Sequence, residues 1–542
     1  MLDVYFVSKL YKSCNSKSIN KMKKLINKSC NAKQFAAFIV YLFVCAVLAK
    51  LMLKGFGDSP HMREIVGGVF LAFLCASRNT FWCISFPLAL LSSIYAPIAY
   101  IYGQPDFQSL ISALSTNLSE TNDFLSDIPF RAYKRSLEII LSIFIVYFLA
   151  IKFNIKPWRN KTFVVSSVIV LACIVGLTSF FSNLLHGVVA TKEEMAALEK
   201  FAKKSSWGES KFNGKFQNYV LIVGESARKD YFSAYGYPID TTPFMSNAPG
   251  LLVDGLIAGD SYTVGSLRLM LTHADTKMWS PRYDLNVIDL AKSAGLKTIW
   301  LSNQGFIGEH DTPISSIGYR ADEHRFPVAG EYHKNGLSDF FLLERFQSIL
   351  STEREQPILI VLHTIGSHPD ACKKTLDVPN KFIASDEKYK YLTCYINTIL
   401  KTDVFVERVF NLLKKNEIEN GRKFSMIYFA DHGQAHYYNS NKVSLNNNST
   451  SALHYEIPLI KIDSYSFDRK INKSRKYGVR FVDGLANWMG IENKNISAYD
   501  LFDGVNDEYD YGYRKILAEK KPIDDPAIDL RPYLTKKIDG AD

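Results

Sequence analysis

Long apolar runs fill the first 189 residues of this 542-residue chain and are rare in the remainder. A run of about 20 apolar residues is long enough to cross the hydrocarbon core of a bilayer as a helix. The first run covers 34–53, and the second, 65–101, is too long for one crossing and is broken by polar residues at 77–80. Two further runs follow at 136–153 and 162–189. The sequence therefore predicts an α-helical membrane domain of five transmembrane helices over 34–189.

The formal net charge of +10 is concentrated at the N-terminus, where eight lysines from Lys9 to Lys33 stand against one acid, Asp3. A basic block directly before an apolar helix is typical of a cytoplasmic end. Nucleic-acid binding would need basic residues among aromatics on a folded face, so we expect no nucleic-acid partner. We expect 1–33 to be a cytoplasmic basic tail. The first apolar run starts too late and is too long for a cleavable signal peptide.

Five crossings would place everything after residue 190 on the side of the membrane opposite to the N-terminus. The loop 152–161 has four basic residues and no acid, as a cytoplasmic loop should. The longer loop 103–135 contains four acids, Asp106, Glu120, Asp123 and Asp127. Charged and apolar residues then alternate at helical spacing in 192–204, which predicts an amphipathic connector within 190–217.

Only two of the eight cysteines, Cys372 and Cys394, lie in the soluble part of the chain. In an oxidising compartment they are candidates for a disulfide, which would stabilise the fold by roughly 3 kcal/mol. The alternative is two unrelated buried thiols, because free cysteine is often simply buried.

Short apolar runs of strand length recur through the soluble part at 219–223, 298–301, 357–362, 425–429 and 457–462. The segments between them are long enough for helices. This alternation predicts an α/β domain over 218–542, with a mostly parallel sheet sandwiched by helices.

Polar residues follow several of these strands directly. Glu225 comes after the first strand, His363 after the third, and Asp431 and His432 after the fourth. Sites in such sheets gather beyond the carboxyl ends of the strands. Together with a hydroxyl at Thr263, these residues form a mixed oxygen and nitrogen ligand set that suits Zn²⁺. Each has a simpler alternative, since Asp-His-Gly is common in surface turns and a glutamate after a strand is often a helix cap.

Thr263 stands at the start of a helical pattern that covers 264–271. Free backbone N–H groups at a helix start favour phosphate, and a metal there would favour the threonine alkoxide as a nucleophile. The alternative is that Thr263 only caps the helix.

Several longer motifs occur in a fixed order: VGESARKDYFSAYGYPIDTTPF (223–244), YTVGSLRLML (262–271), WLSNQG (300–305), HTIGSH (363–368), CYINTILKTD (394–403) and ADHGQ (430–434). With them the chain resembles the phosphoethanolamine transferase family of the alkaline phosphatase and sulfatase superfamily, which includes the enzymes that modify lipid A. The resemblance covers nearly the whole chain. It implies a multi-pass protein of the bacterial inner membrane with a periplasmic, alkaline-phosphatase-like catalytic domain.

The resemblance also implies roles for individual residues. Thr263 would be the nucleophile, and the metal, Zn²⁺ or another divalent ion such as Mn²⁺, would be held by Glu225, Thr263, Asp431 and His432. His368, and less directly His363, would handle the phosphate, a second metal or proton transfer. The last histidine of this kind is either His436 or His454, and we favour His454, which stands just before the strand at 457–462.

The implied reaction moves phosphoethanolamine from phosphatidylethanolamine to an envelope acceptor through a phosphothreonine. The lipid A enzymes have a cysteine-bounded nucleophile loop followed by a proline, whereas here Thr263 has no cysteine nearby and Arg268 stands around the proline's position. These departures favour another acceptor, such as a lipopolysaccharide core sugar, Kdo or a periplasmic glucan, over lipid A.

Three rival functions share parts of this pattern. A sulfatase or phosphodiesterase would use water in place of the acceptor, but the chain has no cysteine or serine at Thr263 in the sulfatase context. A phosphoglycerol transferase would use a different lipid head group. A receptor or scaffold with an inactive domain would not need the four ligands.

Overall fold

The computed structural model of the chain describes residues 32–57, 63–102, 104–105, 130–155, 180–189, 205–304, 313–326 and 338–535. The last range has gaps at 353–354, 370, 440 and 448–450, and a few single residues between 165 and 196 are also described. The chain forms two compact units, one of 1–107 with 128–187 and one of 108–127 with 188–542. The basic tail up to residue 31, most of the acidic loop 103–135 and nearly all of the amphipathic pattern 192–204 lie outside the described residues, so these predictions stay untested.

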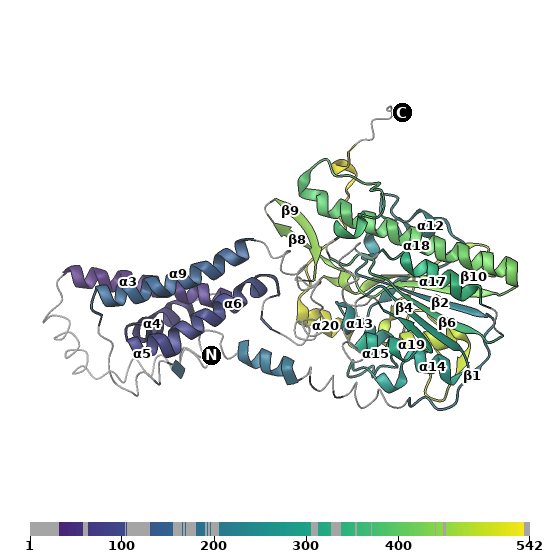
Figure 1. The fold of residues 1–542 in the computed structure, drawn as a ribbon, viewed down its shortest axis with the longest axis horizontal. Helices are drawn as coiled ribbons and strands as arrows, with labels where there is room; N and C mark the ends of the chain where they lie inside the picture. The colour runs from purple at the N-terminus through teal and green to yellow at the C-terminus, as the bar shows by residue number, and fades with distance from the viewer. Residues whose placement is uncertain are drawn as a thin grey trace. The chain divides into compact units, whose positions relative to one another are not determined.

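The first unit is helical (Figure 1). Its helices are α3 (Ala32–Gly55), α4 (Arg63–Cys75), α5 (Arg78–Thr80), the π-helical turn η1 (Phe81–Ser85), α6 (Phe86–Tyr102) and α9 (Phe130–Lys152). The elements α5, η1 and α6 form one continuous helix from 78 to 102. Residues 180–189 are also helical. The predicted break is present, but the non-helical residues between α4 and this long run are 76–77, and the polar residues 78–80 form the start of the second helix.

Small residues let the helices of this unit approach closely. A Cβ atom on Gly68 of α4 would lie 2.4 Å from the Cα atom of Ala46 of α3, which is the kind of contact that packs helices in membranes. Ser93 of α6 and Ser136 of α9 each donate to the other's carbonyl, at 3.0 and 2.8 Å. Within the described residues, two helices, 36–55 and 78–100, are long and apolar enough to cross a membrane, while 66–75 and 180–189 are shorter apolar helices. The count of five spans is therefore not confirmed and stays a prediction.

The second unit is built on a nine-stranded sheet with the order β11-β3-β10-β7-β2-β6-β4-β5, and β12 pairs with β3. The strands are β2 (Asn218–Gly224), β3 (Gly250–Ile257), β4 (Lys297–Ser302), β5 (Glu323–Arg325), β6 (Ile358–His363), β7 (Phe424–Ala430), β10 (Glu456–Asp463), β11 (Arg469–Asn472) and β12 (Lys476–Tyr477). All five predicted strands are present. The central strands β2, β6 and β7 are buried throughout, which is why they read as unbroken apolar runs.

The sheet is mostly parallel, as predicted, and the exception is β10, which runs antiparallel to both of its neighbours, β7 and β3. A hairpin, β8 (Ala435–Asn439) with β9 (Lys442–Asn446), links β7 to β10 in place of a crossover helix. The chain therefore enters β10 at the same end of the sheet at which it left β7. The sequence also missed β3, in which Gly255 and a half-buried Asp254 interrupt the apolar run.

Helices cover both faces of this sheet (Figure 1). The helices α12 (Pro243–Asn247), α17 (Phe341–Leu350) and α18 (Lys390–Asn420) pack together on one side. The other side carries α13 (Thr263–Met270), α14 (Val287–Ser293), α15 (Pro313–Tyr319) and α19 (Phe481–Met489). A short two-stranded sheet, β1 (Lys211–Phe212) with β13 (Ile491–Glu492), joins the start of the unit to the end of α19. This layered α/β arrangement agrees with the predicted fold class.

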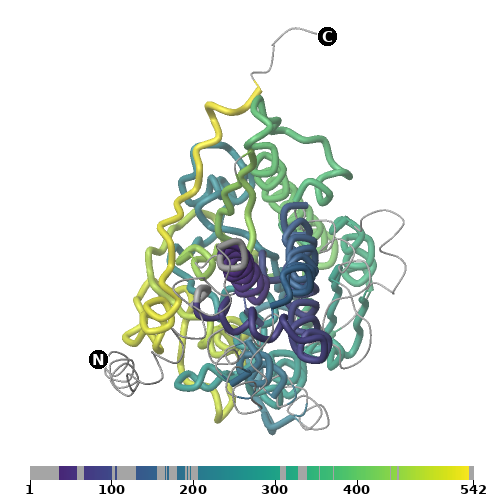
Figure 2. Tube along the Cα trace, turned by 90° about the vertical axis from the view of Figure 1, so that its left-hand side faces the viewer, coloured from purple at the N-terminus to yellow at the C-terminus, as the bar shows by residue number. Residues whose placement is uncertain are grey.

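The C-terminal segment follows α20 (Tyr513–Lys520) along the outside of the second unit and is drawn in yellow in Figure 2. Ile528 accepts a hydrogen bond from Tyr237, and Tyr533 stacks on Tyr389 near the start of α18. A disulfide joins Cys372 to Cys394 of α18 with the Cα atoms 4.9 Å apart. This is the pairing that the cysteine count left open.

Candidate active site

Five chain segments meet at one edge of the sheet. The parallel strands β2, β6 and β7 end there in register, with Val223 opposite His363 and Gly224 opposite Ala430. Because β10 is antiparallel, its first residue lies at the same edge, opposite the last residue of β3, Ile257. The carboxyl end of β3 then delivers the loop that leads to Thr263. The reversed strand thus explains how His454, which precedes β10, reaches this edge, while β3, which runs in the same direction as β7, brings Thr263 there.

Glu225 directly follows β2 and is 1% exposed. Its next neighbour, Ser226, has a φ of 54°, an unfavourable backbone angle for a residue other than glycine. The backbone N–H of Ser226 donates to Asp431 Oδ1 at 2.8 Å, and its hydroxyl donates to Glu225 Oε1 at 2.6 Å. The opposite side of Glu225 is closed by Gly366, where a Cβ atom would lie 3.0 Å from the Glu225 nitrogen. The carboxylate is therefore held at a strained, crowded turn, which is typical of functional sites.

Thr263 is the first residue of α13, and Tyr262 is its N-cap. The interpretation of Thr263 as a mere cap is therefore wrong. Its hydroxyl lies 3.1 and 3.3 Å from the two carboxylate oxygens of Glu225 and 3.2 Å from His432 Nε2. The side chain thus points toward the acidic cluster and away from its own helix.

Asp431 and His432 follow β7 and are both buried. Asp431 Oδ1 accepts from two backbone N–H groups, while its Oδ2 has no hydrogen-bond partner among the described residues. His432 Nδ1 lies 2.5 Å from the Gly433 carbonyl. That contact requires the proton on Nδ1, so Nε2 offers its lone pair to the site, as in a metal-ligating histidine.

The carboxylates repel each other in this buried place. Burial and the neighbouring Asp431 raise the pKa of Glu225 to about 7, and burial raises the pKa of Asp431 to about 6. The ligand atoms of Glu225, Asp431 and His432 all lie within 4.8 Å of one another. Two carboxylates, an imidazole Nε2 and a hydroxyl form a donor set that fits Zn²⁺ or Mn²⁺. Within the described chain, Asp431 Oδ2 accepts no hydrogen bond and lies 3.5 Å from His432 Nε2, so both atoms are available to bind a cation.

His454 and His368 lie close enough to this cluster for its charged side chains to affect their pKa values. His454 is 1% exposed, its Nδ1 lies 3.1 Å from the Ser261 carbonyl, and its Nε2 has no partner within the described chain. Burial lowers the pKa of His454 to about 4. The half-buried His368 directs Nδ1 to the Pro369 carbonyl at 2.6 Å. Burial lowers the pKa of His368, and the Glu225 carboxylate opposes that change.

His436 and His363 are placed differently. His436 has both ring nitrogens engaged, Nδ1 with Asp525 Oδ1 at 2.7 Å and Nε2 with the Tyr231 hydroxyl at 2.6 Å. Its ring therefore belongs to a buried network and has no nitrogen left for a substrate or metal. His363 Nδ1 lies 3.2 Å from the Ser302 hydroxyl, its Nε2 has no partner within the described chain, and burial lowers its pKa to about 3. Of the four candidate histidines, the structure brings His454 and His368 to the cluster.

Two side chains at the site were missed from the sequence. Gln304 Nε2 donates to Glu225 Oε2 at 2.7 Å, and although Gln304 belongs to the WLSNQG motif, nothing in its type marks it as a carboxylate partner. Lys520, the last residue of α20, places Nζ 3.3 Å from the Ser261 hydroxyl and 3.5 Å from Asp260 Oδ1. No motif surrounds Lys520, and only the fold reveals its position.

The chain is similar to several known proteins. A family model described as sulfatase matches residues 217–491. A Haemophilus influenzae protein with the provisional name of a phosphoethanolamine transferase is 39% identical over 416 residues, which covers 75% of this chain and 86% of the relative. The phosphoethanolamine transferase OpgE of Escherichia coli K12 is 32% identical over 439 residues, which covers 76% of this chain and 80% of OpgE. The chain belongs to the phosphoethanolamine transferase family.

A solved member of this family shares the fold. It is the integral membrane protein lipooligosaccharide phosphoethanolamine transferase A (EptA) from Neisseria meningitidis, with a TM-score of 0.54 and 17% identity. The match covers 84% of this chain and 96% of EptA. That share is larger than the second unit alone, so the fold shared by these two phosphoethanolamine transferase family members extends into the helical unit.

Proposed function

We propose that this family member transfers phosphoethanolamine from phosphatidylethanolamine to an acceptor of the cell envelope, with Thr263 as the covalent carrier. The observation that carries the proposal is the position of the Thr263 hydroxyl, within 3.3 Å of both Glu225 and His432 at the first turn of a helix. A hydroxyl in that place is next to a metal-binding donor set and next to free backbone N–H groups. Both features stabilise the charge that develops on a phosphoryl group during transfer.

The metal site would be formed by Glu225, Asp431, His432 and Thr263. When bound, a divalent metal would lower the pKa of the threonine hydroxyl and offset the charge of the phosphoryl oxygens. The chain's own contribution is to hold the ligands in place. Ser226 and the His432 backbone fix Asp431, and Gln304 fixes Glu225.

In the first step, Thr263 Oγ1 forms a bond to phosphorus, the bond from phosphorus to the diacylglycerol oxygen breaks, and the hydroxyl proton passes to solvent. The leaving oxygen takes a proton from a histidine. We assign this role to His368 from its position, because it is half-buried and near enough to Glu225 for that carboxylate to oppose the lowering of its pKa by burial.

In the second step, an acceptor hydroxyl forms a new bond to phosphorus, the bond to Thr263 Oγ1 breaks, and Thr263 recovers a proton from solvent. The acceptor hydroxyl needs a base. We assign this role to His454 from its position, because its Nε2 has no partner within the described chain and burial keeps the ring neutral and able to accept a proton.

The proposed setting is the bacterial inner membrane, with the N-terminus in the cytoplasm and the second unit in the periplasm. The apolar helices support this setting, since they would confine enzyme and lipid donor to one plane. The disulfide between Cys372 and Cys394 is consistent with an oxidising compartment.

The direct test asks whether labelled ethanolamine passes from the lipid donor to Thr263. The full chain in detergent micelles is incubated with phosphatidylethanolamine that carries a labelled ethanolamine, and the protein is digested and analysed by mass spectrometry. We expect one phosphoethanolamine on Thr263, release of diacylglycerol, and no label on the Thr263→Ala chain. Thr352→Ala removes an exposed threonine whose hydroxyl bonds only its own helix end, and this matched control should label like the parent.

The same experiment separates the rival functions. Label on a different residue, or full transfer by Thr263→Ala, would overturn the proposal. A hydrolase would lose the label to water without an acceptor, whereas a transferase should keep it until an acceptor hydroxyl is added. A phosphoglycerol transferase would accept labelled phosphatidylglycerol in place of phosphatidylethanolamine.

A further inference from the structure

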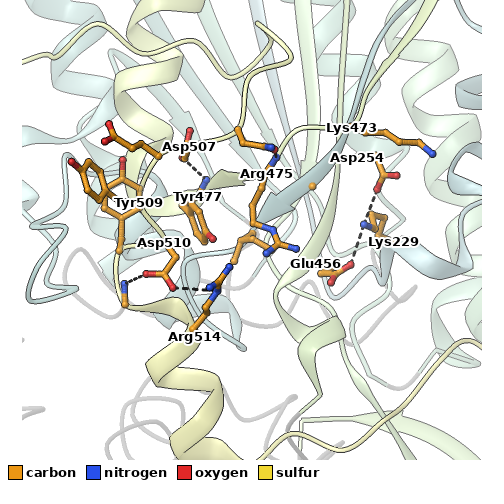
Figure 3. A pocket seen from close by; sticks show the side chains of 16 residues that line it. Lys229, Asp254, Glu456, Lys473, Arg475, Tyr477, Asp507, Tyr509, Asp510 and Arg514 are labelled. Carbon is orange, nitrogen blue, oxygen red and sulfur yellow. Dashed lines mark hydrogen bonds and ion pairs between the residues drawn. The ribbon is translucent and has the colours of Figure 1, made fainter.

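A cavity of about 970 Å³ opens where β3 ends and β10 begins (Figure 3). Its lining comes from the ends of β3 and β10, the segment 473–477 and the loop 506–514. In Figure 3, Tyr477, Tyr509 and Asp507 stand on one side, the ion pair of Lys229 with Asp254 stands on the other, and Arg475 and Arg514 lie between them. A volume of this size is at the upper end of the range for small-molecule sites, about 300–1,000 Å³. We call this cavity the tyrosine pocket.

The charges of the tyrosine pocket largely cancel. Four basic and five acidic side chains line it. Lys229 lies 2.8 Å from Asp254 and 3.1 Å from Glu456, and Arg514 lies 3.7 Å from Asp510. The lining has one carboxylate more than it has basic side chains, and four of its five carboxylates are in ion pairs, Asp254 and Glu456 with Lys229, Asp507 with Lys476 and Asp510 with Arg514. The charge balance therefore favours a neutral, polar ligand.

The side chains are of the types that bind hydroxyl groups and sugar rings. Carboxylates and guanidinium groups accept from and donate to hydroxyls, and an aromatic ring offers an apolar face with a polar tip. Tyr509 is 63% exposed at the pocket, so its ring is available for stacking. Tyr477 and Tyr511 form an edge-to-face pair, with ring centroids 5.6 Å apart, in the wall below.

The pocket is formed in advance of any ligand. The Arg475 backbone N–H donates to Asn506 Oδ1 at 2.7 Å, and the Asp507 backbone N–H donates to the Arg475 carbonyl at 2.9 Å. The Tyr499 hydroxyl fixes Asp507 Oδ2 at 2.8 Å. A site that is already ordered avoids the entropic cost of closing around its ligand.

Three chain segments lead from the tyrosine pocket to the nucleophile. Ile257 lines the pocket and stands six residues before Thr263, and Glu456 lines it two residues after His454. The third segment is α20, with Arg514 at the pocket and Lys520 beside the Ser261 hydroxyl. A helix of eight residues is about 12 Å long, so an extended ligand could occupy the pocket and still reach Thr263.

We propose that the tyrosine pocket binds neutral sugar units of the acceptor, and thereby selects a glycan chain over a phosphorylated lipid sugar. This inference rests on the proposed transfer through Thr263. The sugar that receives phosphoethanolamine would lie at Thr263, and neighbouring units of the same chain would lie against Tyr509 and the polar wall.

The test uses the full chain with Thr263→Ala in detergent micelles, so that binding is measured without transfer. The probe is a neutral linear oligosaccharide of six glucose units, titrated by saturation-transfer NMR. We expect binding that Tyr509→Ala weakens by roughly tenfold, the loss of one well-placed aromatic contact. The matched control is Tyr465→Ala, because Tyr465 is 53% exposed and follows the far end of β10. The control should bind like the parent.

A second arm distinguishes the ligand classes. The same oligosaccharide with one phosphate should bind no more tightly than the neutral one. Tighter binding of the phosphorylated probe by tenfold or more would make the pocket an anion site and overturn the inference, as would neutral binding that Tyr509→Ala leaves unchanged. In the active chain, Tyr509→Ala should raise the KM for the acceptor glycan and leave labelling of Thr263 by the donor unchanged. If Thr263 takes no label in the parent chain, the proposed function fails, whatever the oligosaccharide titration shows.

Discussion

The Lys520 ammonium lies 3.3 Å from the hydroxyl of Ser261, two residues before Thr263. The same ammonium is 3.5 Å from Asp260, and 5.5 Å from the centre of the Tyr455 ring next to His454. Burial lowers the pKa of Lys520, but attraction to neighbouring groups, chiefly the Asp260 carboxylate, outweighs this effect. The pKa of Lys520 is therefore raised above that of a free lysine. A fixed positive charge therefore stands beside the loop that presents the nucleophile.

We predict that Lys520→Met slows the formation of phosphothreonine by about tenfold, the cost of one charge-assisted contact to a phosphoryl group. The rate of diacylglycerol release measures this step. Lys520→Arg should recover part of the rate, because it keeps the charge. Lys515→Met on the same helix removes a lysine whose side chain is 81% exposed, and should not change the rate. An unchanged rate in Lys520→Met would mean that Lys520 only supports the loop.

Metal removal should abolish labelling of Thr263 and lower the midpoint of thermal unfolding. Without a cation, the Glu225 and Asp431 carboxylates are buried side by side and their pKa values are raised by that burial, so the folded state loses stability at neutral pH. Addition of Zn²⁺ or Mn²⁺ after chelation should restore both properties, and elemental analysis should find bound metal in the parent chain.

His432→Ala should reduce the bound metal in that analysis. His324→Ala removes an exposed histidine at β5 and is the matched control, which should keep its metal. Labelling that persists in a fully metal-free chain would contradict the proposed mechanism.

The sequence predicted the central sheet because its strands are buried on both faces and read as apolar runs. It also placed Glu225, Asp431 and His432 together, because residues that follow parallel strands meet at one edge. The arrival of Thr263 at that edge depends on β3, and that of His454 on the reversed direction of β10. Neither could be read from the sequence, since β3 is broken by glycine and strand direction is set by the connecting hairpin.

The choice between His436 and His454 also required the fold. Both stand near the ADHGQ motif, and spacing does not distinguish them. Asp525, which engages His436, lies 89 residues further along the chain. A long-range contact of this kind leaves no local pattern, and the same holds for Lys520.

Loss of the disulfide should destabilise the second unit by about 3 kcal/mol, since the bond closes a loop with a sequence separation of 22. We predict that the double variant Cys372→Ser with Cys394→Ser lowers the midpoint of thermal unfolding under oxidising conditions. Cys83→Ser removes an exposed free cysteine of the first unit and should leave that midpoint unchanged. If a reducing agent lowers the midpoint of the double variant as much as that of the parent, the disulfide is not the cause.

The buried network around His436 predicts a pH-dependent stability. Arg228 lies 2.8 Å from Asp525, and the Asp525 side chain is 1% exposed. Against the effect of burial, His436 and Arg228 hold the pKa of Asp525 below its usual value of 3.8. A carboxyl group whose pKa is lower in the folded than in the unfolded protein stabilises the fold fully at a pH above its pKa in the unfolded protein. This stabilisation is lost as the pH falls below about 3.8 toward the pKa of the group in the folded protein.

Asp525→Asn should therefore cost about 1–3 kcal/mol at neutral pH, because it removes one of the two carboxylates that pair with the buried Arg228 and leaves Asp230 as the other. The difference from the parent should shrink as the pH falls below about 4, where the parent also loses the carboxylate. Urea unfolding at a series of pH values measures this difference. The matched control is Asp529→Asn, because Asp529 pairs with Arg531 at an exposed position, and such surface pairs contribute about 0–1 kcal/mol. A difference for Asp525→Asn that stays constant from pH 7 to pH 3 would show that the lost contact is not ionic.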